Sequence, residues 1–204
     1  MEKPAFMKHG SAGLIELAWG LDFITGQKVA AIVAFCGSLE YHLERAIWKL
    51  RSIDPQGIRP DTDGKIITAM IDMLEQSSGS QPSEAERKML EMWCSGCRSG
   101  FTIRNNIVHG VPMKFGSTLA FCRNPQWHGE QRKKRFGDFW ADENTLDMVR
   151  DAFAVLFRFI VQIEMGETPL AEIAHPFAMK ALGEACSVLG EFANWDYNPS
   201  FEKY

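Results

Sequence analysis

The sequence feature that most constrains the fold is a long helix with both ends marked, predicted over residues 83–109. Ser83 and Glu86 have the spacing of a capping box, in which each side chain satisfies an exposed amide hydrogen of the first turn. At the other end, Gly110 suits a left-handed cap and Pro112 cannot continue a helix. Apolar residues recur at helical spacing in between, which places this helix in a core. They are Met89, Trp93, Cys97 and Ile103.

Two further segments have clear helical periodicity. Residues 27–52, with Thr25 as the expected N-cap, repeat apolar residues every three or four positions. Residues 143–165, capped by Asp142, have an alternating three-four seam, which in a single domain is expected in the core rather than in an extended coiled coil. The expected inward residues are Val29, Ile32, Val33, Cys36, Leu39, Leu43, Ile47 and Leu50 in the first segment, and Leu146, Val149, Phe153, Leu156, Ile160 and Ile163 in the second.

The remaining segments give weaker signals. Short helices are predicted over 14–24 and 65–76, and a last helical region over 168–192 is interrupted by Pro176. Residues 1–10 and 194–204 are expected to be loose tails.

Helical spacing disappears over residues 111–140, where short apolar and aromatic pieces alternate with Gly and Pro, as in a β-hairpin or an irregular insertion. We therefore expect an all-α antiparallel helical bundle with a small β insertion. It is expected to be one domain over 1–204, with its core about 27–165 and a helical extension over 168–193.

Composition places the chain among globular proteins: 46% of its 204 residues are hydrophobic and 24% are charged. The net charge of −4 argues against a surface coated in basic charge for non-specific nucleic-acid binding, but it allows one local basic groove. The odd number of cysteines, five, favours buried reduced thiols over a disulfide scaffold. With no apolar leader and no run of about 18 apolar residues, the expected location is the cytoplasm.

The end of the 83–109 helix carries the side chains that could bind a ligand or catalyse a reaction. They are Arg104, Asn105, Asn106 and His109. Asn105 and His109, four residues apart, share a helix face. Arg104 and His109 are five apart and point about 140° away from each other. For these two to act together, the long arginine side chain must reach around, or the ring must turn where the helix ends.

This set of groups suits a phosphodiester. An arginine can hold two phosphate oxygens and oppose the charge that builds at phosphorus. A neutral histidine can accept the proton of a ribose 2′-hydroxyl, and the protonated ring can then serve the leaving oxygen. No metal is required, and DNA, which lacks the 2′-hydroxyl, could not react in this way.

The run Arg104-Asn-Asn-Ile-Val-His109 resembles the Arg-x(4–6)-His signature of the HEPN superfamily. The resemblance in helix arrangement extends over roughly residues 27–165. The resemblance implies an all-α fold with the motif near the end of a long helix. Many HEPN members are metal-independent endoribonucleases whose two motifs meet across a homodimer interface, and others are inactive binding modules. It implies Arg104, Asn105 and His109 as catalytic residues, RNA as substrate and no cofactor. It leaves open a toxin or defence role with an antitoxin-type protein partner.

Other interpretations of the motif remain open. Arg104 and His109 could instead complement the helix dipole and cap its last carbonyls in a purely structural domain. The same pattern recurs from Arg123 to His128, but Pro125 and the irregular context disfavour that copy. Glu40 is expected either to face the motif or to lie exposed at a helix margin, and His42, His9 and His175 have no partners that the sequence identifies.

The 111–140 insertion and the cysteines offer further candidates. The basic cluster Arg132-Lys133-Lys134-Arg135 could bind an RNA backbone or form a solvated loop. The aromatic residues Trp127, Phe139 and Trp140 could stack on bases or form the core of a hairpin. Cysteines 94, 97 and 122 with His128 could bind zinc, although buried thiols are the commoner outcome.

Overall fold

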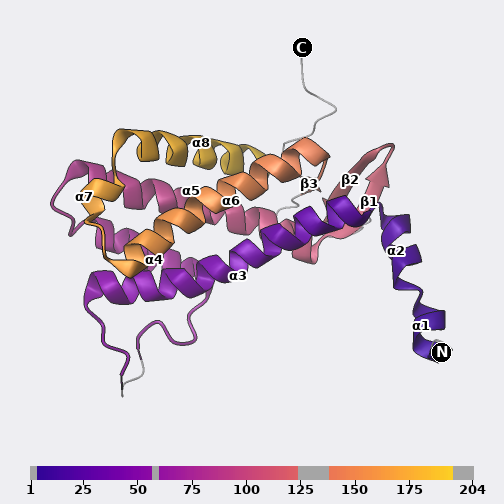
Figure 1. Ribbon diagram of the computed structural model, residues 1–204, viewed down its shortest axis with the longest axis horizontal. Helices are drawn as coiled ribbons and strands as arrows, with labels where there is room; N and C mark the ends of the chain where they lie inside the picture. The colour runs from indigo at the N-terminus through magenta and orange to yellow at the C-terminus, as the bar shows by residue number, and fades with distance from the viewer. Residues whose placement is uncertain (1–3, 57–59, 124–137, 195–204) are drawn as a thin grey trace, which may run out of the picture.

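In the computed structural model, which describes residues 4–56, 60–123 and 138–194, four long helices lie side by side (Figure 1). They are α3 (Phe23–Arg51), α5 (Glu84–His109), α6 (Glu143–Met165) and α8 (Pro176–Ala193). The shorter α4 (Ile67–Ser78) and α7 (Leu170–Ile173) lie toward one end of the bundle, and a small sheet lies at the other. The chain is thus all-α with a small β insertion, as the sequence predicts.

Capping side chains determine where the long helices begin. The predicted capping box forms: Ser83 Oγ accepts from the Glu86 amide at 3.2 Å, and Glu86 Oε2 accepts from the Ser83 amide at 3.0 Å. Asp142 caps α6 as expected. The prediction for α3 is wrong by one turn, because Asp22 is the cap and Thr25 donates its amide hydrogen to Asp22 Oδ1 at 2.8 Å. An ionised carboxylate is at least as good a cap as a hydroxyl, so the helix begins earlier.

Helices α3 and α6 run in the same direction. Lys28 near the start of α3 pairs with Asp147 near the start of α6, at 2.7 Å between Nζ and Oδ2. His42 pairs further along with Glu164, near the end of α6. A parallel pair needs a long connection between its members, and the segment from α4 to β3 supplies it.

Helices α5 and α8 form a second parallel pair, which runs opposite to α6. From Gly96 to Gly100 of α5 the neighbouring residue advances along α8 and moves back along α6. The neighbours are Cys186 then Leu189 in α8, and Leu156 then Phe153 in α6. The bundle therefore combines parallel and antiparallel neighbours, an arrangement that periodicity alone does not specify.

The core contains the predicted seams. All six seam residues of α6 are buried, and in α3 Ile32, Cys36, Leu39, Leu43 and Ile47 are buried, whereas Val29, Val33 and Leu50 are partly buried. Trp93 of α5 is fully buried, and its indole Nε1 donates to the Leu156 carbonyl of α6 at 2.8 Å. All five cysteines are free thiols, in agreement with the sequence-based expectation.

The sheet is an antiparallel hairpin with a short third strand. Strands β1 (Val111–Phe115) and β2 (Thr118–Cys122) pair around Gly116, whose φ of 62° allows the tight turn, and β3 (Phe139–Trp140) pairs with β2. The predicted hairpin in the 111–140 insertion is thereby confirmed.

The N-terminal segment differs from the prediction. Residues 5–10, expected to be a loose tail, form α1 (Ala5–Gly10), and the next helix is α2 (Ala12–Trp19) rather than 14–24. We call α1 and α2 together the N-terminal arm; it projects from the bundle beside β1 (Figure 1) and buries none of its residues. No single helix in the described ranges is long and apolar enough to cross a membrane; the arm and α3 meet that test only as a pair bent by 91°.

Candidate functional site

The motif helix α5 ends abruptly at His109 because the chain passes directly into a strand. Gly110 has φ −84° and ψ 153°, an extended conformation, so the predicted left-handed cap is wrong. Glycine is needed there for close approach: an added Cβ would lie 2.3 Å from the Asn106 carbonyl oxygen and 2.9 Å from Phe121 Cβ. The hairpin thus packs against the helix terminus and holds its last turn in place.

The four polar residues of the motif divide between core and surface. Asn106 points inward and is 3% exposed, whereas Arg104 and Asn105 are half-buried and His109 is exposed. Arg104 Nη1 donates to Asn105 Oδ1 at 3.1 Å, so the amide holds one edge of the guanidinium. The structure therefore brings Arg104 and Asn105 into direct contact.

His109 is not brought into that contact. Among the described residues, neither a hydrogen bond nor an ion pair joins its ring to Arg104, to Asn105 or to a backbone carbonyl. Its exposure at the helix terminus matches the divergence of about 140° expected for residues five apart. Neither side chain donates to the helix carbonyls in the part of the chain that is described, so the capping part of the structural interpretation gains no support. His109 does lie in the last turn of α5, where a charged ring would complement the helix dipole.

The guanidinium of Arg104 acts on a buried thiol of the neighbouring helix. Burial raises the pKa of Cys36 to about 12, while Arg104 lowers that pKa and Glu40 raises it, which places both charged groups near this thiol. Because the thiol stays neutral near pH 7, it supplies no countercharge to Arg104. Glu40 is half-buried on α3, and no ion pair joins it to Arg104 within the described ranges.

The aromatic residues of the insertion serve its own packing. Phe139 is buried and stacks on Phe121 with centroids 6.5 Å apart, and Trp140 tilts against Phe115 at 5.4 Å. The hairpin-core interpretation therefore holds for Phe139, and Trp140 follows it in large part. The basic cluster 132–135, Trp127 and His128 lie outside the described residues, as does the end of the second motif copy.

The described cysteines are not placed together as the ligands of a zinc site would be. Cys94 and Cys97 are buried inside α5, and Cys122 is buried at the end of β2. Among the described residues there is no group of three His, Cys, Asp or Glu side chains placed to hold a metal ion.

Sequence reasoning missed one cluster between α3 and α6. His42 Nδ1 pairs with Glu164 Oε2, and Arg45 Nε donates to Glu164 Oε1 at 2.6 Å. Burial opposes ionisation of Glu164, but hydrogen bonds from His42 and Arg45 outweigh it and hold its pKa below the ordinary value. No local pattern could reveal this pairing, because 122 positions separate His42 from Glu164.

Comparison with known proteins adds no relative: no protein-family model matches the chain, and no curated protein or solved structure gives a significant match.

Proposed function

We propose that this protein is a HEPN-like, metal-independent endoribonuclease of the cytoplasm that acts on single-stranded RNA as a homodimer. Arg104 binds the scissile phosphate, Asn105 positions it and His109 exchanges the proton. One observation carries the proposal: a single helix end presents a guanidinium that forms no ion pair with a carboxylate in the described residues, and it also exposes an imidazole on another side of the helix.

The setting of Arg104 favours an anionic ligand. A half-buried charge is costly unless it is paired. Among the described residues Arg104 donates to an uncharged amide and lies near a neutral thiol, and it forms no ion pair with Glu40, the carboxylate that also lies near that thiol. A phosphate oxygen could accept two of the guanidinium hydrogens that Asn105 leaves free. Binding RNA would therefore stabilise the site by supplying the countercharge that α5 lacks at this end.

The proposed reaction needs only these groups and the substrate. The neutral His109 ring accepts the proton of the ribose 2′-hydroxyl as its oxygen attacks phosphorus, and the bond to the 5′-oxygen breaks. A protonated ring returns a proton to that oxygen, which leaves a 2′,3′-cyclic phosphate and a 5′-hydroxyl. Because His109 and Arg104 diverge on one helix, two copies side by side would let the ring of one chain serve a phosphate held by the other.

The test is cleavage of single-stranded RNA by the full chain in chelator. His109→Ala should lower the rate by about 10²–10⁴-fold, the usual contribution of a general acid–base, and Arg104→Ala should weaken RNA binding as well. The matched control is His175→Asn, because His175 caps α8 and asparagine is a good cap, so this variant should keep full activity. Cleavage that survives unchanged in His109→Ala, or cleavage of the matching DNA, would refute the proposal.

A second candidate function, a catalytically silent RNA- or nucleotide-binding module, is favoured by one observation. No side chain in the described ranges hydrogen-bonds His109, whereas a general base is commonly oriented by a third group. This alternative predicts RNA binding that depends on Arg104 but not on His109, with intact RNA recovered after long incubation.

A further inference from the structure

The N-terminal arm and the first turn of α3 carry an unusual share of the exposed apolar surface. Eight of the fifteen large hydrophobic residues that are exposed in the described part of the chain lie between residues 6 and 24. Phe23 is 84% exposed, Phe6 73% and Leu14 69%. The others are Met7, Ile15, Leu17, Trp19 and Ile24.

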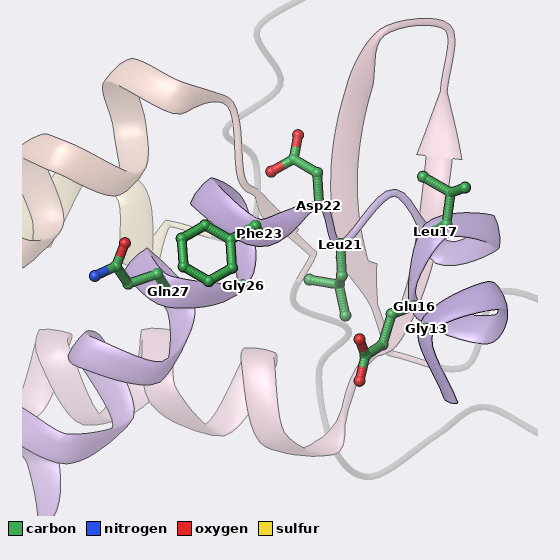
Figure 2. Close-up of a pocket in the computed structure, with 8 residues that line it drawn as sticks. All are labelled: Gly13, Glu16, Leu17, Leu21, Asp22, Phe23, Gly26 and Gln27. Atoms are coloured by element: carbon green, nitrogen blue, oxygen red, sulfur yellow. The ribbon is translucent and has the colours of Figure 1, made fainter. Parts of the chain in front are cut away.

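A groove lies beside these side chains, where the arm meets the bundle. It has a volume of about 830 Å³ and lies between α2 and the first turns of α3, with Leu17, Leu21 and Phe23 among its lining residues (Figure 2). Gly13 and Gly26 also line it, and an added Cβ at either would meet no atom within 4 Å. In the single chain, exposed apolar side chains and a largely apolar groove therefore lie next to each other.

The extent of this surface matches a protein interface. If each of these eight side chains is given roughly the 150–250 Å² of an aromatic residue, their exposed fractions sum, over all faces of the segment, to an upper range of about 700–1,200 Å². A stable interface buries about 800 Å² per partner, whereas the largest apolar patch of a typical monomer is about 300–600 Å². Helices of 6 and 8 residues are also too short to persist alone in water, so their helical form calls for a packing partner.

The charges of the segment favour a protein partner over a lipid surface. Between residues 4 and 26 the formally charged side chains are Lys8, Glu16 and Asp22, with a net charge of −1. Helices that lie on membranes are typically rich in Lys and Arg on their polar face. Two of these three charges are carboxylates that line the groove, which would repel an anionic bilayer.

We propose that the occupant is a second copy of this chain, with the arms of two protomers packed reciprocally against each other. Apolar side chains of one arm fill the groove of the other, and the contact is reciprocal, since arm and groove belong to one surface that a two-fold axis can pair with itself. Leu17 belongs to both parts of that surface.

This arrangement deepens the proposed function by naming the segment that makes the dimer. The arm ends beside the strand that follows the motif helix: an added Cβ on Gly20, the C-cap of α2, would be 3.5 Å from Lys114 Cδ of β1, which begins two residues after His109. A copy bound through the arm therefore lies beside the hairpin that follows α5.

Sedimentation equilibrium of the full chain at micromolar concentration, without RNA, tests the proposal. The wild-type chain should be a dimer. Leu14→Lys combined with Leu17→Lys should raise the dimer dissociation constant about 100-fold or more, as when central apolar anchors are replaced by charges. Gly26→Leu fills the groove and should also weaken the dimer, while thermal unfolding of the monomer stays unchanged or rises because leucine favours a helix over glycine.

Ile66→Lys is the matched control, because Ile66 is 71% exposed at the start of α4, outside the arm, and should leave the dimer intact. A monomeric wild-type chain would overturn the proposal, and so would a dimer that both the Leu14/Leu17 double variant and Gly26→Leu leave unchanged. A monomer that floats with phosphatidylcholine–phosphatidylglycerol vesicles would assign the arm to a lipid surface instead. A dimer that does not cleave RNA refutes the proposed function alone; RNA cleavage by a monomer refutes the arm-mediated dimer.

Discussion

Two arginines on α5, six residues apart, occupy opposite electrostatic settings. Arg98 is held by two carboxylates of α4: its Nη2 lies 2.7 Å from Asp72 Oδ1 and 2.7 Å from Glu75 Oε2. Within the described residues, the one side-chain hydrogen bond of Arg104 is to the amide of Asn105. The arginine in the middle of the helix therefore joins α5 to α4 through ion pairs, whereas the arginine at its end forms no ion pair in the described residues.

The difference separates the part of the helix that builds the fold from the part that is free to bind. In the middle of α5 the polar side chains form hydrogen bonds within the protein: Trp93 donates to Leu156, and Arg98 donates to Glu75 of α4. At the end, Arg104 keeps donors free and His109 is exposed. Substitutions in the middle should therefore change stability, and those at the end should change function.

The largest expected difference is in the free energy of unfolding, between the variants Trp93→Ala and His109→Ala. Truncating the fully buried indole should lower the free energy of unfolding by about 3–5 kcal/mol, because a cavity forms and the Leu156 carbonyl loses its donor. Removing the exposed His109 ring should change it by less than about 0.5 kcal/mol. Urea unfolding of both variants measures this contrast, and equal losses would contradict the division of α5.

Gly110→Ala should have an intermediate effect. The new Cβ meets the Asn106 carbonyl oxygen and Phe121, so the helix end and the hairpin must move apart, at a cost of about 1–3 kcal/mol. The same shift should displace His109 and reduce RNA cleavage. The control is Gly37→Ala in α3, where an added Cβ meets nothing and should stabilise the chain by up to about 1 kcal/mol. A Gly110→Ala protein with wild-type stability would show that the hairpin does not hold this terminus.

The smallest effect distinguishes the two arginines themselves. The hydrogen bond from Arg98 lowers the pKa of Glu75 below 4.5, so this pair stabilises the fold above pH 4.5 and ceases to do so as the pH falls through the lowered value. Arg98→Met should cost about 0.5–1 kcal/mol at pH 7, since the pair is partly exposed, and nothing well below the folded pKa.

Arg104→Met should lack that pH dependence and should not destabilise the fold, because no carboxylate among the described residues loses a partner. Chemical unfolding at several pH values compares the two variants. A cost for Arg104→Met that vanishes in acid would reveal an ion pair and remove the basis for its role in binding phosphate.

The sequence predicts best what depends on neighbouring residues. The capping box at Ser83 and the seam of α6 are local patterns, and both appear as expected. The start of α3 is displaced because Asp22 competes with Thr25 as a cap. The motif residues lie at the end of a long helix, as predicted, but the conformation of Gly110 depends on Phe121 of the hairpin, which no local pattern of α5 contains.

What the sequence could not predict comes from distant contacts. The pairing of His42 with Glu164 requires the parallel arrangement of α3 and α6, which periodicity does not specify. The same holds for the setting of Arg104, which is defined by a thiol on α3 and by Glu40 of that helix, with which Arg104 forms no ion pair in the described ranges. Helix spacing identifies which face is apolar but not which charged residues lie opposite.

The parallel pairing of α3 with α6 also has a consequence during synthesis. The side chains that join them are 119 and 122 positions apart, so α3 leaves the ribosome well before its partner exists. Until residue 165 has been made, the apolar stripe of α3 has no α6 to cover it and is open to chaperones or to incorrect association. Closing a chain loop of this length also slows folding, relative to a bundle in which helices that pack together follow each other in the sequence.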